Sequence, residues 1–148
     1  MKLHHILLVI HLIAASVWVG GHLVLSIGLL PKALKQKDPN IIIDFERKYE
    51  PVGMPALVLL IITGVWMAYD YGVPIHQWFS FSGSIETVIS TKLLLLFLTF
   101  GFALHAQLDV IPNLNKDNLK EMAFHIVTVT VIGVTMLVLG SSVRYGGI

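Results

Sequence analysis

The sequence contains no cysteine among its 148 residues. The absence of thiols excludes disulfide bonds, iron–sulfur clusters, thiolate copper sites and haem attached through thioether links. A bound metal would therefore be held by histidine, methionine or carboxylate side chains, with imidazole as the leading ligand.

Charged residues are also scarce, at 13% of the chain, whereas 55% of the residues are hydrophobic. The net charge of +1, spread over scattered basic residues, excludes a nucleic-acid-binding protein. A soluble domain of this length cannot hide so much apolar surface in one small core. The composition therefore predicts an integral membrane protein whose first partner is the lipid bilayer.

The chain shows no internal repeat or low-complexity tract, so we expect one transmembrane domain over residues 1–148. A helix needs about 20 apolar residues to cross the hydrocarbon core, and four segments are long enough. They are 6–30, 52–72, 87–109 and 121–142. The N-terminal apolar run is too long for a signal peptide and is interpreted as the first membrane helix. The predicted fold class is all-α, an up-down four-helix bundle.

The connections between the spans predict an orientation. The first connection is charged and amphipathic, which favours a short helix lying at the membrane interface. The first and third connections are rich in basic residues, whereas the opposite side has only Lys2 and Arg144. By the positive-inside rule, these two connections face the cytoplasm and both termini face outward. The basic residues counted are Lys32, Lys35, Lys37, Arg47, Lys48, Lys116 and Lys120.

Four of the seven histidines fall within the predicted spans. Ionisable groups are costly in a membrane and mark functional sites by default. At 1.5 Å per residue, His22, His105 and His125 lie about 6 to 12 Å inside the cytoplasmic ends of three helices. Three imidazoles at one depth predict a shared site for a metal or a metal porphyrin.

A second polar layer is predicted in the outer half of the membrane. His11 lies there at about the depth of Lys92, and about 16 Å along the helix axis from His22. His11, Trp18 and His22 share one face of the first helix. Small residues on this helix allow close approach of another helix or of a flat cofactor. These small residues are Ala14, Ala15, Ser16, Gly20 and Gly21.

Several other residues have weaker claims to a functional role. Met54 and Met122 lie near the cytoplasmic layer and could supply thioether ligands to Cu(I), although methionine is common in apolar helices. Lys92 has a second interpretation, because its side chain can extend to the outer surface. The histidines outside the spans are expected to be solvated polar groups; they are His4, His5 and His76.

The same segments resemble the CopD copper-resistance domain family and its HemJ-like haem-binding relatives. The resemblance runs through HLIAASVWVGG, FERKYEPVGMPALVLLIITG and TKLLLLFLTFGFALH. It implies a multi-pass protein of the bacterial inner membrane. In HemJ-like proteins, which bind haem b, the residues matched by His11 and Lys92 are the functional pair. His22, which directly follows Gly-Gly, and His125 depart from that pattern and favour a histidine-ligated haem or copper.

Two hypotheses follow. In the first, His22 and His105 hold haem b, with His125 as the alternative ligand or a hydrogen-bonding partner. Such a protein would transfer electrons or oxidise quinol or porphyrinogen, with a quinone or another redox partner. A porphyrinogen oxidase would require His11 and Lys92 to act together.

In the second hypothesis, His22, His105 and His125 bind copper for uptake or resistance, assisted by Met54 or Met122. The histidines near the outer surface would then capture the ion. The sequence favours haem over copper. It leaves open whether the protein is an enzyme and whether it forms a homo-oligomer.

Overall fold

The computed structural model describes residues 2–148, and this range folds into helices without a single strand. The first long helix comprises α1 (Lys2–Leu23), a π-helical segment η1 (Val24–Leu29) and α2 (Leu30–Gln36). It is followed by α3 (Asn40–Asp70) and a short 3-10 turn, η2 (Ile75–Gln77). The chain ends with α4 (Ser84–His105), π-helical η3 (Ala106–Val110), α5 (Leu119–Ser142) and a final 3-10 turn, η4 (Val143–Tyr145).

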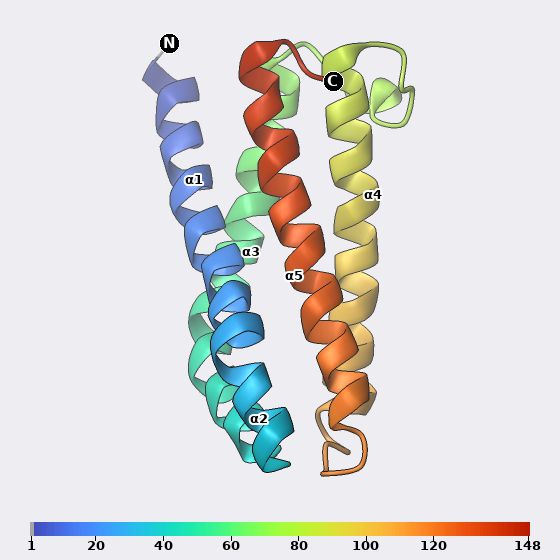
Figure 1. Cartoon of the computed structure of the whole chain (residues 1–148). Helices are drawn as coiled ribbons and strands as arrows, with labels where there is room; N and C mark the ends of the chain where they lie inside the picture. The colour runs from blue at the N-terminus through green and yellow to red at the C-terminus, as the bar shows by residue number, and fades with distance from the viewer. Residues whose placement is uncertain (1) are drawn as a thin grey trace.

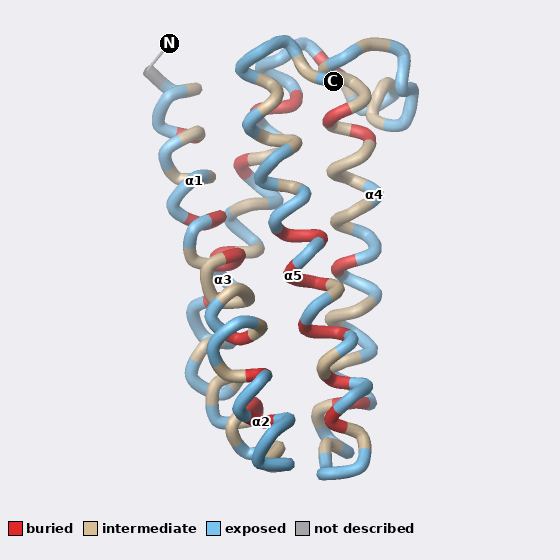
Figure 2. The backbone as a smooth tube through the Cα atoms, viewed as in Figure 1, coloured by how far each residue is buried: buried red, intermediate tan, exposed pale blue. Residues whose placement is uncertain are grey.

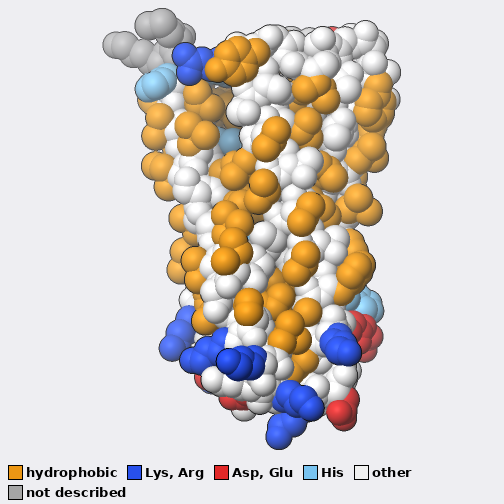
Figure 3. Space-filling view, in the orientation of Figure 1, with side chains coloured by type: hydrophobic (Ala, Val, Ile, Leu, Met, Phe, Trp, Pro, Cys, Tyr) orange, Lys and Arg blue, Asp and Glu red, His pale blue; other side chains and the backbone are white. Residues whose placement is uncertain are grey.

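Successive long helices run up and down, so both termini lie at one end of the bundle (Figure 1). We call this the terminal end, and it also carries the α3–α4 connection, residues 71–83. The opposite end carries α2 and the α4–α5 connection, residues 111–118. Most of the Lys and Arg side chains visible in Figure 3 gather there, so we call it the basic end.

All four long helices are long and apolar enough to cross a membrane. Their spans are Leu3–Gln36, Asn40–Asp70, Ser84–Val110 and Leu119–Tyr145. The outer surface is largely hydrophobic between the two ends, and much of each helix is exposed (Figures 2 and 3). A surface of this kind requires lipid as its solvent. The chain is a multi-pass membrane protein, and the predicted all-α four-helix bundle is confirmed.

The separate interfacial helix expected between the first two spans is absent from the described residues. The charged residues 41–50 instead form the first turns of α3, which runs unbroken to Asp70. Pro51 and Pro55 lie inside α3, so this helix begins well before the expected span 52–72. Each proline removes one backbone donor, a loss that membrane helices tolerate when neighbouring groups satisfy the freed carbonyls. Pro31 lies in the first turn of α2, directly after the π-helical η1, and the long helix continues through it to Gln36.

The apolar core lies in the half of the bundle nearer the basic end. One buried cluster joins η1 and α2 to α3, η3 and α5, and includes Leu25, Ile42 and Ile126. A second cluster lies between α1, α3 and α5, and includes Trp18 and Val129. Together these clusters fix the helices firmly in this half.

Tyr49 of α3 joins that helix closely to α1. Its hydroxyl donates a hydrogen bond to the carbonyl of Trp18, at 2.8 Å. Its ring lies between Gly21 of α1 and Gly53 of α3, and a Cβ at either glycine would collide with the ring. At Gly53 the added atom would lie 2.6 Å from Cε1 of Tyr49. Gly21 therefore makes room for a side chain of the neighbouring helix, one of the two alternatives that the sequence left open.

Gly21→Ala should lower the free energy of unfolding by about 1–3 kcal/mol, because the added methyl group displaces a tightly packed ring. Gly20→Ala is the matched control, since a Cβ there meets nothing within 4 Å. Denaturation of both variants in detergent, followed by circular dichroism, measures the difference. Equal stability of the two variants would contradict this packing.

Candidate cofactor site

A cavity of about 310 Å³ lies between α1, α3, α4 and α5, in the half of the bundle nearer the terminal end. Its lining residues on α4 extend from Ile85 to Thr99, about 21 Å at 1.5 Å per residue. The cavity is therefore elongated along the bundle axis. Its walls are mainly aliphatic and aromatic, and its volume falls within the range of about 300–1,000 Å³ found for small-molecule sites.

His11 lines this cavity with a ring orientation fixed by α3. Its Nδ1 lies 2.7 Å from the Thr63 hydroxyl, which in turn donates to the carbonyl of Leu59 at 2.6 Å. Because the Thr63 hydrogen is directed to Leu59, its oxygen accepts from His11. Nδ1 of His11 therefore carries the hydrogen, and Nε2 keeps an unshared electron pair. The imidazole is thus prepared to bind a metal or to accept a proton.

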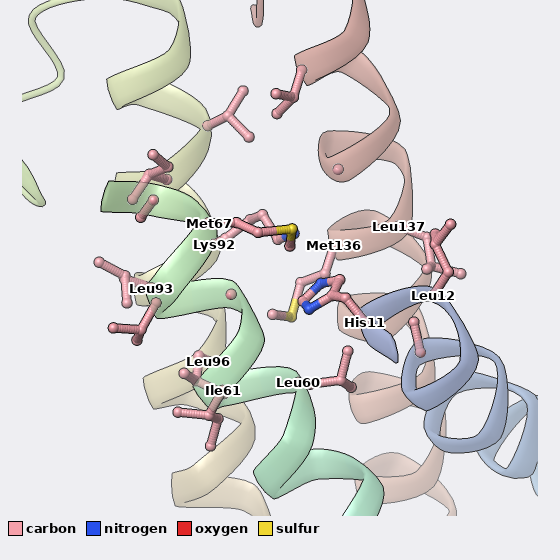
Figure 4. Close-up of a pocket in the computed structure, with 18 of the residues that line it drawn as sticks. His11, Leu12, Leu60, Ile61, Met67, Lys92, Leu93, Leu96, Met136 and Leu137 are labelled. Atoms are coloured by element: carbon pink, nitrogen blue, oxygen red, sulfur yellow. The ribbon is translucent and has the colours of Figure 1, made fainter. Parts of the chain in front are cut away.

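Three further side chains with polar or polarisable groups enter the cavity from the other helices. Met67 of α3, Lys92 of α4 and Met136 of α5 point into the same space as His11 (Figure 4). Two glycines provide room for the polar members. A Cβ at Gly64 would lie 3.4 Å from Cε1 of His11, and one at Gly140 would lie 3.3 Å from Nζ of Lys92.

The structure brings His11 and Lys92, which were expected to share a depth, to the same cavity. Sequence reasoning overlooked Met67 and Met136. The spacing of Met67 from Thr63, four residues on one helix, places both on the same face and was the available signal. Trp18 is buried and lines the cavity as well, on the side toward the core.

The three histidines nearer the basic end, which were expected to share one site, occupy two separate places. Nδ1 of His105 lies 2.8 Å from Nε2 of His125, and the two rings stack with centroids 4.9 Å apart. His22 instead bonds the carbonyl of Trp18, on its own helix, at 2.9 Å and packs edge-on against Tyr49. Within residues 2–148, no three or more His, Asp or Glu side chains approach closely enough to hold a metal ion. The structure thus joins His105 to His125 and leaves His22 apart.

The two methionines considered with these histidines lie outside any polar site. Met54 is exposed on α3. Met122 is buried in the apolar cluster near the basic end, among residues such as Leu119 and Ile126. Equal depth along the helices therefore did not bring these two side chains to a common site.

Comparisons of the chain with protein-family models, with curated proteins and with solved structures give no match. The resemblance to CopD and HemJ-like proteins therefore stays a prediction. The function has to be inferred from the geometry of the site.

Thr63→Val should release His11 from its fixed tautomer, because valine has the same shape and no acceptor. In the unmodified protein, the ¹⁵N chemical shifts of the His11 ring should report a protonated Nδ1. In Thr63→Val they should report a mixture of tautomers. Thr91→Val is the control, because the Thr91 hydroxyl bonds the carbonyl of Thr87 on its own helix. A protonated Nε2 in the unmodified protein would refute the assignment.

Proposed function

We propose that the cavity binds haem b through Nε2 of His11, and that the protein transfers electrons or oxidises a quinol or porphyrinogen in the membrane. The observation that carries this proposal is the hydrogen-bond chain from His11 through Thr63 to Leu59. Metal-binding histidines commonly donate their other ring N–H to a fixed acceptor, which holds the tautomer and the ring orientation. His11 lines this cavity, whereas His22, His105 and His125 do not.

The residues around the cavity fit a porphyrin. The aliphatic and aromatic walls suit a flat apolar ring, and the thioether of Met67 or Met136 would help His11 to hold it. The ammonium group of Lys92 would pair with the carboxylates of the haem propionates. When bound, haem supplies one-electron chemistry, and the protein supplies the ligands, the orientation and the exclusion of water.

A Cu(I) site is the second candidate, and the two methionines favour it. Imidazole and thioether groups are ligands that Cu(I) prefers, and His11, Met67 and Met136 all enter the cavity. The positive charge of Lys92 in the same cavity disfavours a bare cation. It favours a cofactor that carries carboxylates, and we therefore put haem first. This alternative differs from the copper site expected from His22, His105 and His125.

The resemblance to HemJ-like proteins supports the same site, because it also singles out His11 and Lys92. It further supports a location in the bacterial inner membrane. The basic connections support an orientation with the basic end in the cytoplasm. The cavity would then lie in the outer half of the membrane.

His11→Ala should abolish the visible absorbance of the purified protein while the protein still inserts into the membrane. His22→Ala is the matched control, because His22 lies on the same helix and bonds that helix's own carbonyl. It should keep the sharp α-band of reduced b-type haem. Loss of absorbance in His22→Ala but not in His11→Ala would instead place the haem site near the basic end.

Met67→Leu and Met136→Leu distinguish the two cofactors. Under the haem proposal, loss of the thioether that helps to hold the haem shifts the spectrum in one of the two variants and leaves iron content unchanged. Under the copper alternative, each variant lowers copper content, because each sulfur supplies one bond. Metal analysis with visible spectroscopy separates these results. Neither metal in the unmodified protein would contradict both.

A reporter enzyme fused after Ile148 should be active only if it functions outside the cytoplasm. The reason is the excess of basic residues in the connections at the other end of the bundle. Activity of a cytoplasmic reporter at this position would reverse the orientation and place the cavity in the inner half of the membrane.

A further inference from the structure

The stacked histidines at the basic end form a second polar site, remote from the cavity. His105 closes α4, His125 lies in the second turn of α5, and Asp109 follows His105 by four residues on η3. Nε2 of His105 lies 3.5 Å from Oδ2 of Asp109. The half-exposed His105 and the more exposed Asp109 (48% and 66%) give water access to this position.

The hydrogen bonds determine where the ring hydrogens lie. Nδ1 of His125 lies 2.9 Å from the carbonyl of Glu121, which can only accept, so Nδ1 carries a hydrogen. In the neutral ring, Nε2 of His125 is then an acceptor, and it receives the hydrogen on Nδ1 of His105. Nε2 of His105 is consequently left with an electron pair, and it faces a carboxylate oxygen.

Two acceptors that face each other at this distance repel, and they require a donor or a cation between them. A proton on the histidine pair would satisfy this requirement, but the separation of 3.5 Å exceeds the usual 2.7–3.2 Å of an N–H···O hydrogen bond. Two ligands bound to one metal ion at about 2.0–2.1 Å with a tetrahedral angle lie about 3.3 Å apart. The observed distance is compatible with this second arrangement.

We propose that Nε2 of His105 and Oδ2 of Asp109 bind a divalent transition-metal ion, such as Zn²⁺ or Cu²⁺. Imidazole and carboxylate are ligands that these ions accept. With only two protein ligands, the remaining positions would be taken by water or an exogenous group. The site is distinct from the cavity, and it does not depend on haem or copper binding there.

Each of the two proposed ligands is oriented by a hydrogen bond to another residue. His125 accepts the hydrogen on Nδ1 of His105 and so directs Nε2 of that ring outward. Nδ2 of Asn113 donates to the carbonyl of Asp109 at 2.8 Å and contacts its Oδ1 at 3.4 Å, which leaves Oδ2 toward His105. Partners of this kind are typical of metal-binding histidines and carboxylates. His125 is therefore a positioning residue here and not a ligand.

The test is a Cu²⁺ titration of the full-length chain as purified, freed of any affinity tag, and followed by electron paramagnetic resonance. The unmodified protein should bind one more Cu²⁺ ion per chain than either His105→Ala or Asp109→Asn. The spectrum of that additional ion should show hyperfine coupling to one imidazole nitrogen. His4→Ala is the control, because His4 and Asp70 form another histidine–carboxylate pair, at 3.0 Å. This control should keep the one-imidazole signal.

His125→Phe tests the positioning role, because it keeps a ring and removes the acceptor. It should weaken Cu²⁺ binding by about 10- to 100-fold and keep the one-imidazole signal. Equal Cu²⁺ binding by the unmodified protein, His105→Ala and Asp109→Asn would overturn the proposal and leave a proton as the cation. Two coupled imidazoles in the unmodified protein, reduced to one in His125→Phe, would overturn the role of His125. Haem absorbance should be the same in all these variants, so the outcome is separate from that for the cavity.

Discussion

The contact between Tyr49 and the two glycines is the constraint on which the arrangement of the helices depends. Helices in lipid gain little from burying apolar surface, so close association requires small residues that let another chain segment approach. Gly21 and Gly53 provide this for α1 and α3, and α4 contacts α5 more closely than it contacts α3. The bundle is therefore two helix pairs joined near the basic end. The cavity is the space that remains between the pairs toward the terminal end.

The four intramembrane histidines differ mainly in the partner of Nδ1. In His22 and His125 this nitrogen bonds a carbonyl four residues earlier on the same helix. Such a bond fixes a ring against its own helix and requires no other element. In His11 the partner is a hydroxyl on α3, and in His105 it is the imidazole of His125. A ring that is held by a neighbouring helix keeps its orientation relative to a site between helices, which is what a ligand requires.

The sequence predicted the features that depend on length and depth. The four spans follow from apolar runs of sufficient length, and the sharing of a cavity by His11 and Lys92 follows from equal depth on two helices. The directions of the side chains were harder to predict. His22 lies at a depth similar to that of His105 and His125, yet its ring faces Trp18 and Tyr49. Depth depends on residue number alone, whereas direction depends on how each helix is rotated in the bundle.

The same limit applies to the sequence-based view of the cytoplasmic layer as one metal site. Rotation of α4 and α5 brings His105 against His125, and this contact uses the electron pair of His125 that a shared metal would need. The other ring nitrogen of His105 then faces Asp109, a residue that equal depth in the membrane did not indicate. The start of the second span, expected at residue 52, also differs from the structure, because α3 begins at Asn40 and continues through Pro51 and Pro55.

The apolar clusters around Ile126 and Val129 lie between the two proposed sites and separate them sterically, but they do not screen one site from the charge of the other. His125 and Met136 are eleven residues apart on α5, about 16 Å along its axis. A divalent ion bound beside Asp109 changes the local charge at the basic end by two units, from that of the carboxylate alone to about one net positive charge. At an effective dielectric constant of about 20, one unit charge at 16 Å changes the energy of another by about 1 kcal/mol. An ion at the basic end would thus favour the reduced form of a cofactor in the cavity, without any ligand in common.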